Sequence, residues 1–183
     1  MVGQRDNRMG SICIVYATTD GHTRTICERL RELVERAGHA VDLVSIQQAR
    51  AADVLACDKI VVGASIRYGR HNPLVHEFVE ANAAALATKP SAFFSVNIVA
   101  RKPGKNQPDS NPYLRKFLRQ IRWRPNEVDV FAGRLDYPRY GFLDRLMIRF
   151  IMLITKGPTD PTEVTEFTDW QRVEAFARRV ASM

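Results

Sequence analysis

Cysteine is scarce in this sequence, and long apolar runs are missing from it. Cys13, Cys27 and Cys57 stand singly, with no C-x-x-C spacing, so we expect neither a disulfide framework nor a metal site. Apolar stretches such as Phe150 to Ile154 are far shorter than the roughly 20 residues of a membrane-spanning helix. The N-terminus has no charged-then-apolar signal pattern, and we therefore expect a cytoplasmic protein.

Low-complexity segments and internal repeats are also missing, and the composition is that of a globular protein. Of the 183 residues, 45% are hydrophobic and 26% are charged, as is usual for folded domains. This length suffices for one domain with a proper core and is short for two. Residues 1–9 are polar and aperiodic, so we expect a disordered tail followed by a single domain over residues 10–183.

Acidic residues are outnumbered by basic ones. The chain has 27 Lys and Arg against 20 Asp and Glu, a net charge of +7. This excess favours anionic partners, such as a phosphate cofactor, a carboxylate-bearing substrate, an acidic membrane surface or nucleic acid. Charge alone does not choose among them.

Apolar strands alternate with amphipathic helices along the chain. The expected strands are residues 11–17, 40–46, 58–65, 91–99 and 127–133, and the expected helices are residues 23–37, 73–86, 112–122 and 168–183. Such an alternation predicts a doubly wound α/β fold with helices on both faces of a parallel sheet. Its most economical form is the five-stranded flavodoxin-like order 2-1-3-4-5, in which ligands bind at the carboxyl ends of the strands.

Two stretches exceed a minimal version of this fold. Residues 100–111 form a polar, basic loop, and residues 133–161 insert a loop and an apolar helix over 141–156. Such a helix can bury one side on the domain and lay the rest in an anionic membrane interface. We expect a peripheral contact with the membrane surface, and packing against the sheet or in a homo-oligomer contact is the alternative.

The turn between the first strand and the first helix is suited to a phosphate. Helix N-terminal amides are unpaired, Gly21 permits close approach of the backbone, and Thr18 and Thr23 can donate hydroxyl hydrogen bonds. The turn lacks the Lys-Ser/Thr of a nucleotide triphosphatase and the three glycines of a dinucleotide fold. It therefore suits FMN, although Thr and Asp here could also simply cap the helix. The candidate residues are Thr18, Thr19, Asp20, Gly21, His22 and Thr23.

Several strings of residues carry a family resemblance. They are the phosphate loop, Gly63-Ala64-Ser65-Ile66-Arg67-Tyr68-Gly69, Ser95-Val96-Asn97-Ile98-Val99-Ala100-Arg101-Lys102-Pro103, Trp123-Arg124-Pro125 and Tyr137-Pro138-Arg139-Tyr140. With them the chain, from Gly10 to Ala181, resembles the flavodoxin-type, quinone-dependent protoporphyrinogen oxidases of bacteria. The resemblance implies FMN-dependent oxidation of protoporphyrinogen IX to protoporphyrin IX in haem synthesis, with electrons passed to menaquinone or another respiratory quinone. It implies a location on the cytoplasmic face of the inner membrane.

The flavin ring is expected between the loops that follow the third, fourth and fifth strands. The residues are Ser65, Ile66, Arg67 and Tyr68, then Ser95, Val96 and Asn97, then Leu135, Tyr137 and Tyr140. Tyr68 and Tyr137 are candidates for stacking on the ring. A basic rim of Arg67, Arg70, Arg101, Lys102, Lys105 and Arg139 could hold the two propionates of the substrate, and we favour Arg67, Arg101, Lys102 and Arg139.

No catalytic residue stands out. The sequence offers no Ser-His-Asp or paired-carboxylate set, and we read His71 as a polar cap and not as a proton shuttle. We expect hydride transfer from substrate to flavin, with the proton acceptor unassigned.

Other functions on the same scaffold stay open. A plain flavodoxin electron carrier is usually acidic, which the charge of +7 opposes, and another flavodoxin-like quinone oxidoreductase is a second alternative. A phospho-receiver would need acidic residues at the strand ends, where Ala17-Thr18-Thr19 and Gly63-Ala64-Ser65 stand. The basic stretch 115–124 reads as a solvated face, so no nucleic acid is expected.

Overall fold

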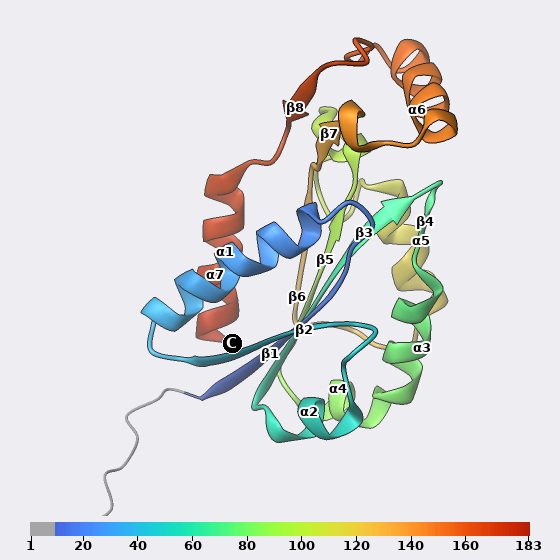
Figure 1. Cartoon of the computed structure of the whole chain (residues 1–183). Helices are drawn as coiled ribbons and strands as arrows, with labels where there is room; N and C mark the ends of the chain where they lie inside the picture. Colours follow the sequence, from blue (N-terminus) through green and yellow to red (C-terminus); the bar gives the residue numbers. More distant parts are fainter. Residues whose placement is uncertain (1–9) are drawn as a thin grey trace, which may run out of the picture.

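Five parallel strands form the centre of the molecule, which a computed structural model describes for residues 10–183; the expected tail over residues 1–9 lies outside this range. The strands are β1 (Ser11–Ala17), β2 (Ala40–Ser45), β3 (Lys59–Arg67), β5 (Ser91–Val96) and β6 (Glu127–Phe131). They lie in the order β2-β1-β3-β5-β6 (Figure 1). Counted along the chain, this is the expected order 2-1-3-4-5, which is confirmed.

The central strands are buried on both faces, as expected from their nearly continuous apolar sequences. Every residue of β5 is buried. Gly63 of β3 lies opposite Phe94 of β5 in the parallel register. A Cβ atom at position 63 would stand 2.2 Å from the Cζ atom of Phe94, so only glycine leaves room for that ring.

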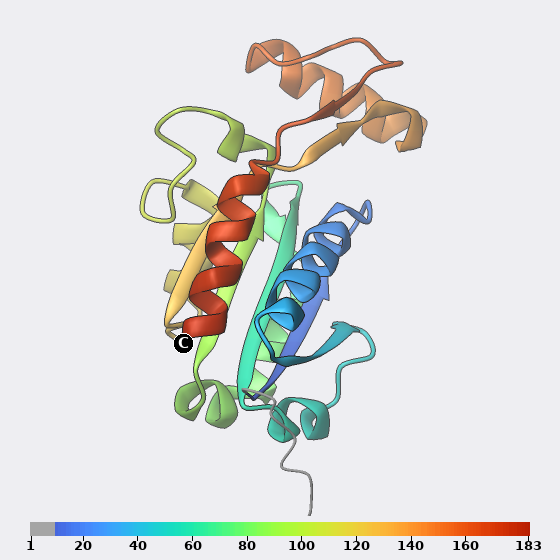
Figure 2. The ribbon, with the colours of Figure 1, turned by 90° about the vertical axis from the view of Figure 1, so that its left-hand side faces the viewer.

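Helices cover both faces of the sheet. On one face lie α1 (His22–Arg36) and α7 (Trp170–Ser182), as Figure 2 shows. On the other lie α2 (Ala51–Ala56), α3 (Pro73–Ala81), α4 (Ala83–Thr88) and α5 (Pro112–Gln120). Each face has its own apolar cluster, with Phe94 and Phe176 on the first and Phe93 and Phe117 on the second.

Several short features depart from the sequence-based expectation. Helix α2 was not expected, and the strand expected over 91–99 ends at Val96, before the 3-10 turn η1 (Ile98–Arg101). The helix expected over 73–86 is two helices, because the Asn82 side chain donates to the carbonyl oxygen of Phe78 at 2.9 Å and closes the first of them. Strand β3 continues into a hairpin, with β4 (Arg70–His71) antiparallel to its end. The central residues of this turn, Tyr68 and Gly69, have φ of 49° and 78°, as a type I′ turn requires.

The insertion over residues 133–167 forms a small unit beyond the carboxyl ends of the strands (Figures 1 and 2). Strands β7 (Arg134–Asp136) and β8 (Val164–Glu166) pair antiparallel, with the 3-10 turn η2 (Tyr137–Arg139) and helix α6 (Phe142–Ile154) between them. The expected apolar helix is therefore confirmed. Within residues 10–183, no helix is both long and apolar enough to cross a membrane.

Helix α6 buries only a narrow side. The helix contacts the rest of the chain mainly through Ile148 and Met152. Eight other apolar side chains are 40% to 79% exposed: Phe142, Leu143, Leu146, Met147, Phe150, Ile151, Leu153 and Ile154. The widest apolar face of α6 thus points into solvent.

Candidate functional site

The turn between β1 and α1 has the backbone of an anion-binding loop. Gly21 is the N-cap of α1 with φ of 86°, a left-handed conformation that favours glycine. Its N–H donates to Oγ1 of Thr18 at 3.0 Å, and no side chain caps the helix. The amides of the first turn are therefore left for an external acceptor, and the simple capping interpretation of Asp20 does not hold.

Thr23 provides a second sign that the loop binds an anion. Its side chain is 1% exposed, and its Oγ1 is buried without a hydrogen-bond partner among residues 10–183. A buried hydroxyl without a partner is costly. A phosphate oxygen in front of the N-terminus of α1 would satisfy this hydroxyl and the free amides together, so the residues present fit a phosphate monoester.

The phosphate loop opens into a cavity of about 180 Å³. Its walls come from the loop, the end of β3 with its hairpin, the segment after β5, strand β7 and helix α6. The lining residues are Thr18, Asp20, His22, Thr23, Ser65, Ile66, Arg67, Tyr68, Gly69, Val96, Asn97, Ile98, Val99, Tyr113, Gly133, Arg134, Leu135, Tyr140, Ile148, Ile151 and Met152. A polar end at the loop thus meets a mostly apolar wall, the pattern usual for a cofactor pocket.

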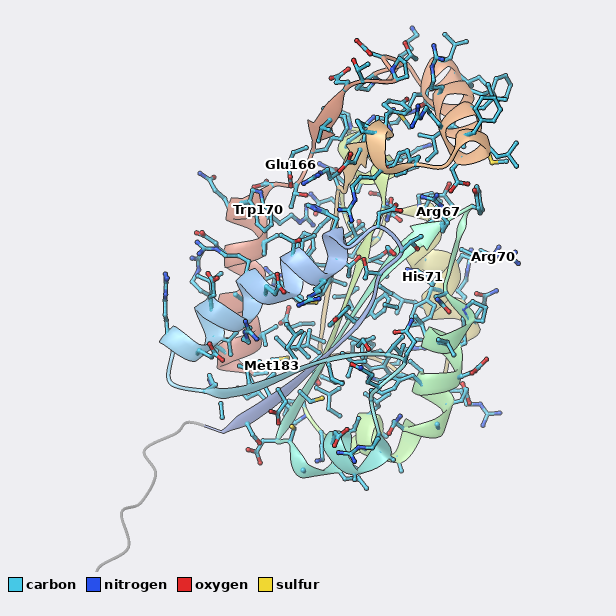
Figure 3. The ribbon with its side chains drawn as sticks, viewed as in Figure 1. Arg67, Arg70, His71, Glu166, Trp170 and Met183 are labelled. Atoms are coloured by element: carbon cyan, nitrogen blue, oxygen red, sulfur yellow. The ribbon has the colours of Figure 1, made fainter. Side chains whose placement is uncertain are left out.

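Arg67, labelled in Figure 3 at the end of β3, links the phosphate loop to helix α6. Its Nη1 donates to Oδ2 of Asp20 at 3.0 Å, and its Nη2 donates to Asp144 of α6. The guanidinium carbon lies 5.3 Å and 5.4 Å from the ring centroids of Tyr68 and Tyr140. Burial raises the pKa of the Asp20 carboxyl above its ordinary value, and the nearby Arg67 opposes that shift.

His22 lines the opposite side of the loop. Thr168 donates its hydroxyl to the carbonyl oxygen of Ala132 at 2.9 Å, so at 2.7 Å it accepts from Nε2–H of His22. The same nitrogen lies 3.4 Å from Oε1 of Glu166, which Figure 3 labels near Trp170. Burial lowers the pKa of His22, and Glu166 opposes this shift.

A buried polar network lies behind the cavity. Asn97 accepts from the N–H of Ala100 and from Nδ2 of Asn111, both at 3.1 Å. Its own Nδ2 donates to Oγ of Ser95 at 3.2 Å, and Ser95 lies 3.0 Å from Nε2 of His71. Burial lowers the pKa of His71 to about 3, so its imidazole is neutral. The interpretation of His71 as a polar cap was wrong, because Asn72 caps helix α3 and accepts from the N–H of Leu74 at 3.0 Å.

Most of the expected cofactor residues meet at this cavity. Those that line it are Thr18, Asp20, His22, Thr23, Ser65, Ile66, Arg67, Tyr68, Val96, Asn97, Leu135 and Tyr140. Thr19, Gly21 and Ser95 do not line it, although Gly21 donates to Thr18 and Ser95 accepts from Asn97.

Tyr137 requires a correction. Its side chain is fully buried with Leu135 and Met152, and its hydroxyl donates to the carbonyl oxygen of Pro158 at 2.7 Å. Tyr137 is therefore a core residue of the insertion and not a ring-stacking residue. The Tyr68 side chain is exposed and lines the cavity.

The expected basic rim is also only partly free. Arg101 donates to Oγ1 of Thr155 at 2.9 Å and to the carbonyl oxygen of Ile98 at 3.0 Å, and Arg67 is engaged by two carboxylates. Lys102 and Arg139 do not line the cavity, and neither forms a side-chain ion pair within the described part of the chain.

Sequence reasoning missed the wall that α6 provides. Ile148, Ile151 and Met152 line the cavity, as do Tyr113 at the start of α5 and Arg134 of β7. The apolar pattern of residues 141–156 was a signal that this helix had something to cover. It could not show which of its sides faces the cavity, because the apolar residues cover more of the helix than one docking face needs.

The fold and the loop together define a class of protein. A family model described as a flavodoxin domain matches residues 13–162, so the chain belongs to the flavodoxin family, and this membership implies a flavin cofactor. Solved flavodoxins are similar in fold. One from the domain Archaea has a TM-score of 0.54 at 15% identity and covers 94% of this chain and 96% of its own. Oxidised Flavodoxin 1 from Bacillus cereus has a TM-score of 0.52 at 12% identity, with coverage of 94% and 97%.

Closer relatives narrow the family. The protoporphyrinogen IX dehydrogenase (quinone) of Escherichia coli strain K12 is 42% identical over 170 residues, which cover 93% of this chain and 94% of that protein. The Leishmania major protein of the same name is 44% identical over 171 residues, covering 93% of this chain and 74% of that one. The chain belongs to this family of oxidoreductases.

Proposed function

We propose that this protein is an FMN-dependent enzyme that oxidises protoporphyrinogen IX to protoporphyrin IX and passes the electrons to menaquinone or another respiratory quinone. The named activity of the relatives supports the substrate and the quinone. The observation that carries the cofactor is the buried, unpartnered hydroxyl of Thr23 at the mouth of an apolar cavity. In this proposal, residues 10–183 act as one domain.

FMN is the flavin that the loop suits best. The amides that follow Gly21 and the hydroxyls of Thr18 and Thr23 would hold one terminal phosphate. The residues around the ring would be Ser65 to Tyr68, Val96, Asn97, Leu135 and Tyr140. When bound, the flavin supplies the hydride acceptor.

The protein's own groups bind, orient and exclude water. Asn97 is held by Ser95, Ala100 and Asn111, so its amide presents a fixed edge to the cavity. Ile148 and Met152 of α6 cover the apolar wall and keep water from it. Arg139 is exposed, and Lys102 is partly exposed; both are available to the substrate propionates.

Helix α6 is proposed to dock on the cytoplasmic face of the inner membrane. Its exposed apolar side chains, with the exposed cations Arg149 and Lys156 beside them, have the character of an interfacial helix. Because the same helix walls the cavity, this placement would bring the flavin close to a quinone dissolved in the lipid.

One experiment tests the whole proposal. The purified holoprotein is mixed anaerobically with protoporphyrinogen IX, and the flavin absorbance is followed; a menaquinone analogue is then added. We expect bleaching on the first addition, recovery on the second, and release of FMN and not FAD on denaturation. A protein that carries no flavin, or a bound flavin that the porphyrinogen does not bleach, would contradict it.

A further inference from the structure

Asp20 presents an electrostatic problem for the proposed cofactor. Among the described residues, Asp20 is the one carboxylate that lines the cavity, and it lies in the loop that must accept a phosphate dianion. A bare carboxylate there would repel the phosphate in a partly desolvated site. Within residues 10–183, the cations that line the cavity with it are Arg67 and Arg134, and Arg134 pairs with Asp136.

Arg67 is built to neutralise this charge. Its side chain is 22% exposed and reaches Asp20 from the neighbouring strand at 3.0 Å. The Tyr68-Gly69 turn, with positive φ at both positions, pins Arg67 opposite Arg70. The second half of the guanidinium fork is occupied by Asp144, and two tyrosine rings flank it. The cation is therefore held in place before any ligand arrives.

We propose that Arg67 is a positioning residue that makes the loop selective for a phosphorylated flavin, because its ion pair with Asp20 offsets the carboxylate charge beside the phosphate. Arg67 therefore serves the charge balance of the loop, and not the carboxylates of the substrate as its sequence context suggested. This inference rests on the proposed FMN site. It predicts that Arg67 raises the affinity for FMN more than the affinity for riboflavin, which lacks the phosphate.

The test compares the dissociation constants of FMN and riboflavin for the flavin-free full-length chain, by flavin fluorescence. Arg67→Met should weaken FMN binding roughly tenfold more than riboflavin binding, because the two flavins share the ring and only FMN carries the phosphate. Asp20→Asn added to Arg67→Met should restore most of the FMN affinity, because the unpaired carboxylate is gone. Arg67→Lys keeps the charge and should keep most of the preference for FMN.

Asp144→Asn is the matched control. It removes the other carboxylate that binds the same guanidinium, but Asp144 lies on α6 and does not line the cavity. Because the Arg67–Asp20 pair stays in place and a second nearby negative charge is removed, we expect the preference for FMN over riboflavin to be kept or to rise. Should Arg67→Met fail to fold, as judged by its melting transition, Arg67→Lys and Asp20→Asn decide the matter: both should preserve or increase the preference for FMN.

The outcomes separate this inference from the proposed function. A wild-type chain that binds FMN no better than riboflavin would remove the phosphate site itself. A wild-type chain that prefers FMN, with an Arg67→Met variant that weakens both flavins equally, would overturn the role of Arg67 alone. The role of Arg67 would also be overturned if Asp20→Asn did not restore the FMN affinity lost in Arg67→Met. The same holds if Arg67→Lys lost the preference for FMN over riboflavin.

Discussion

Gly21 shows how one backbone angle prepares the phosphate loop. Its φ of 86° exposes the first amides of α1, and a Cβ atom there would meet nothing within 4 Å. Gly21→Val therefore acts through the backbone and not through a clash; a β-branched residue at positive φ costs about 1–3 kcal/mol. We expect a folded but colourless protein, measured as flavin absorbance after gel filtration.

Gly104 offers the matched control for this substitution. It too has a positive φ, of 74°, with open space around it, and it does not line the cavity. Gly104→Val should lose a similar free energy of unfolding in a denaturant titration and still carry flavin. If both variants keep their flavin, the conformation of Gly21 has no part in cofactor binding.

His71 makes the stability of the fold depend on pH. Burial against Phe93 and Phe117, with His76 nearby, lowers the pKa of the His71 imidazole from 6.5 to about 3. Between these two pKa values the unfolded chain binds a proton that the folded chain does not. The contribution of His71 to the free energy of unfolding is therefore fully present above pH 6.5 and is lost as the pH falls toward 3. The loss is about 1.4 kcal/mol per pH unit.

Urea titrations at several pH values measure this contribution. His71→Gln removes the imidazole but leaves the other titrating groups in place. The difference in unfolding free energy between the wild-type protein and His71→Gln should therefore shrink by about 1.4 kcal/mol per pH unit as the pH falls below 6.5. Parallel curves for the two proteins would mean that His71 is already accessible to protons in the folded state.

At the scale of elements, the packing of β3 beside β5 depends on the absence of a side chain at Gly63. Gly63 faces the ring of Phe94, which is fully buried between the sheet and Phe176. Gly63→Ala should cost about 1–3 kcal/mol of unfolding free energy, because that ring cannot move aside without displacing its neighbours. Gly133→Ala, whose added Cβ atom would lie 3.4 Å from Val96, is the milder comparison. Equal denaturation midpoints for the two variants would refute the packing argument.

Helices and strands whose apolar residues recur at one regular spacing could be predicted from the sequence. Features that depend on a particular contact with another residue could not. The buried strands and the helix after Gly21 follow from local patterns alone. The break at Asn82 depends on one side-chain hydrogen bond to Phe78. Likewise, the ribbon of β7 and β8 pairs segments nearly thirty positions apart, and each strand has only three residues, too few for a periodic signal.

The same distinction holds for the whole molecule and its site. The phosphate loop lies within one strand-turn-helix unit, so Thr18 and Thr23 could be found from sequence. The pairing of Asp20 with Arg67 and the burial of Tyr137 arise from contacts across the fold. A residue type at a strand end thus indicates where a site lies, while its role depends on the neighbours that the fold supplies.

The whole molecule also carries the charge and the surface for the proposed membrane contact. With a net charge of +7 and the exposed face of α6 beyond the sheet, we expect the protein to float with anionic vesicles at low salt and to dissociate as salt screens the attraction.

Phe142→Ser with Phe150→Ser should abolish flotation and retain activity with a soluble acceptor, because both side chains point into solvent. Leu55→Ser is the matched control: Leu55 is 63% exposed but lies on α2, at the opposite end of the sheet, so its loss should leave flotation unchanged. Wild-type protein that stays with the soluble fraction at low salt would exclude a direct membrane contact and leave the exposed face of α6 to a protein partner.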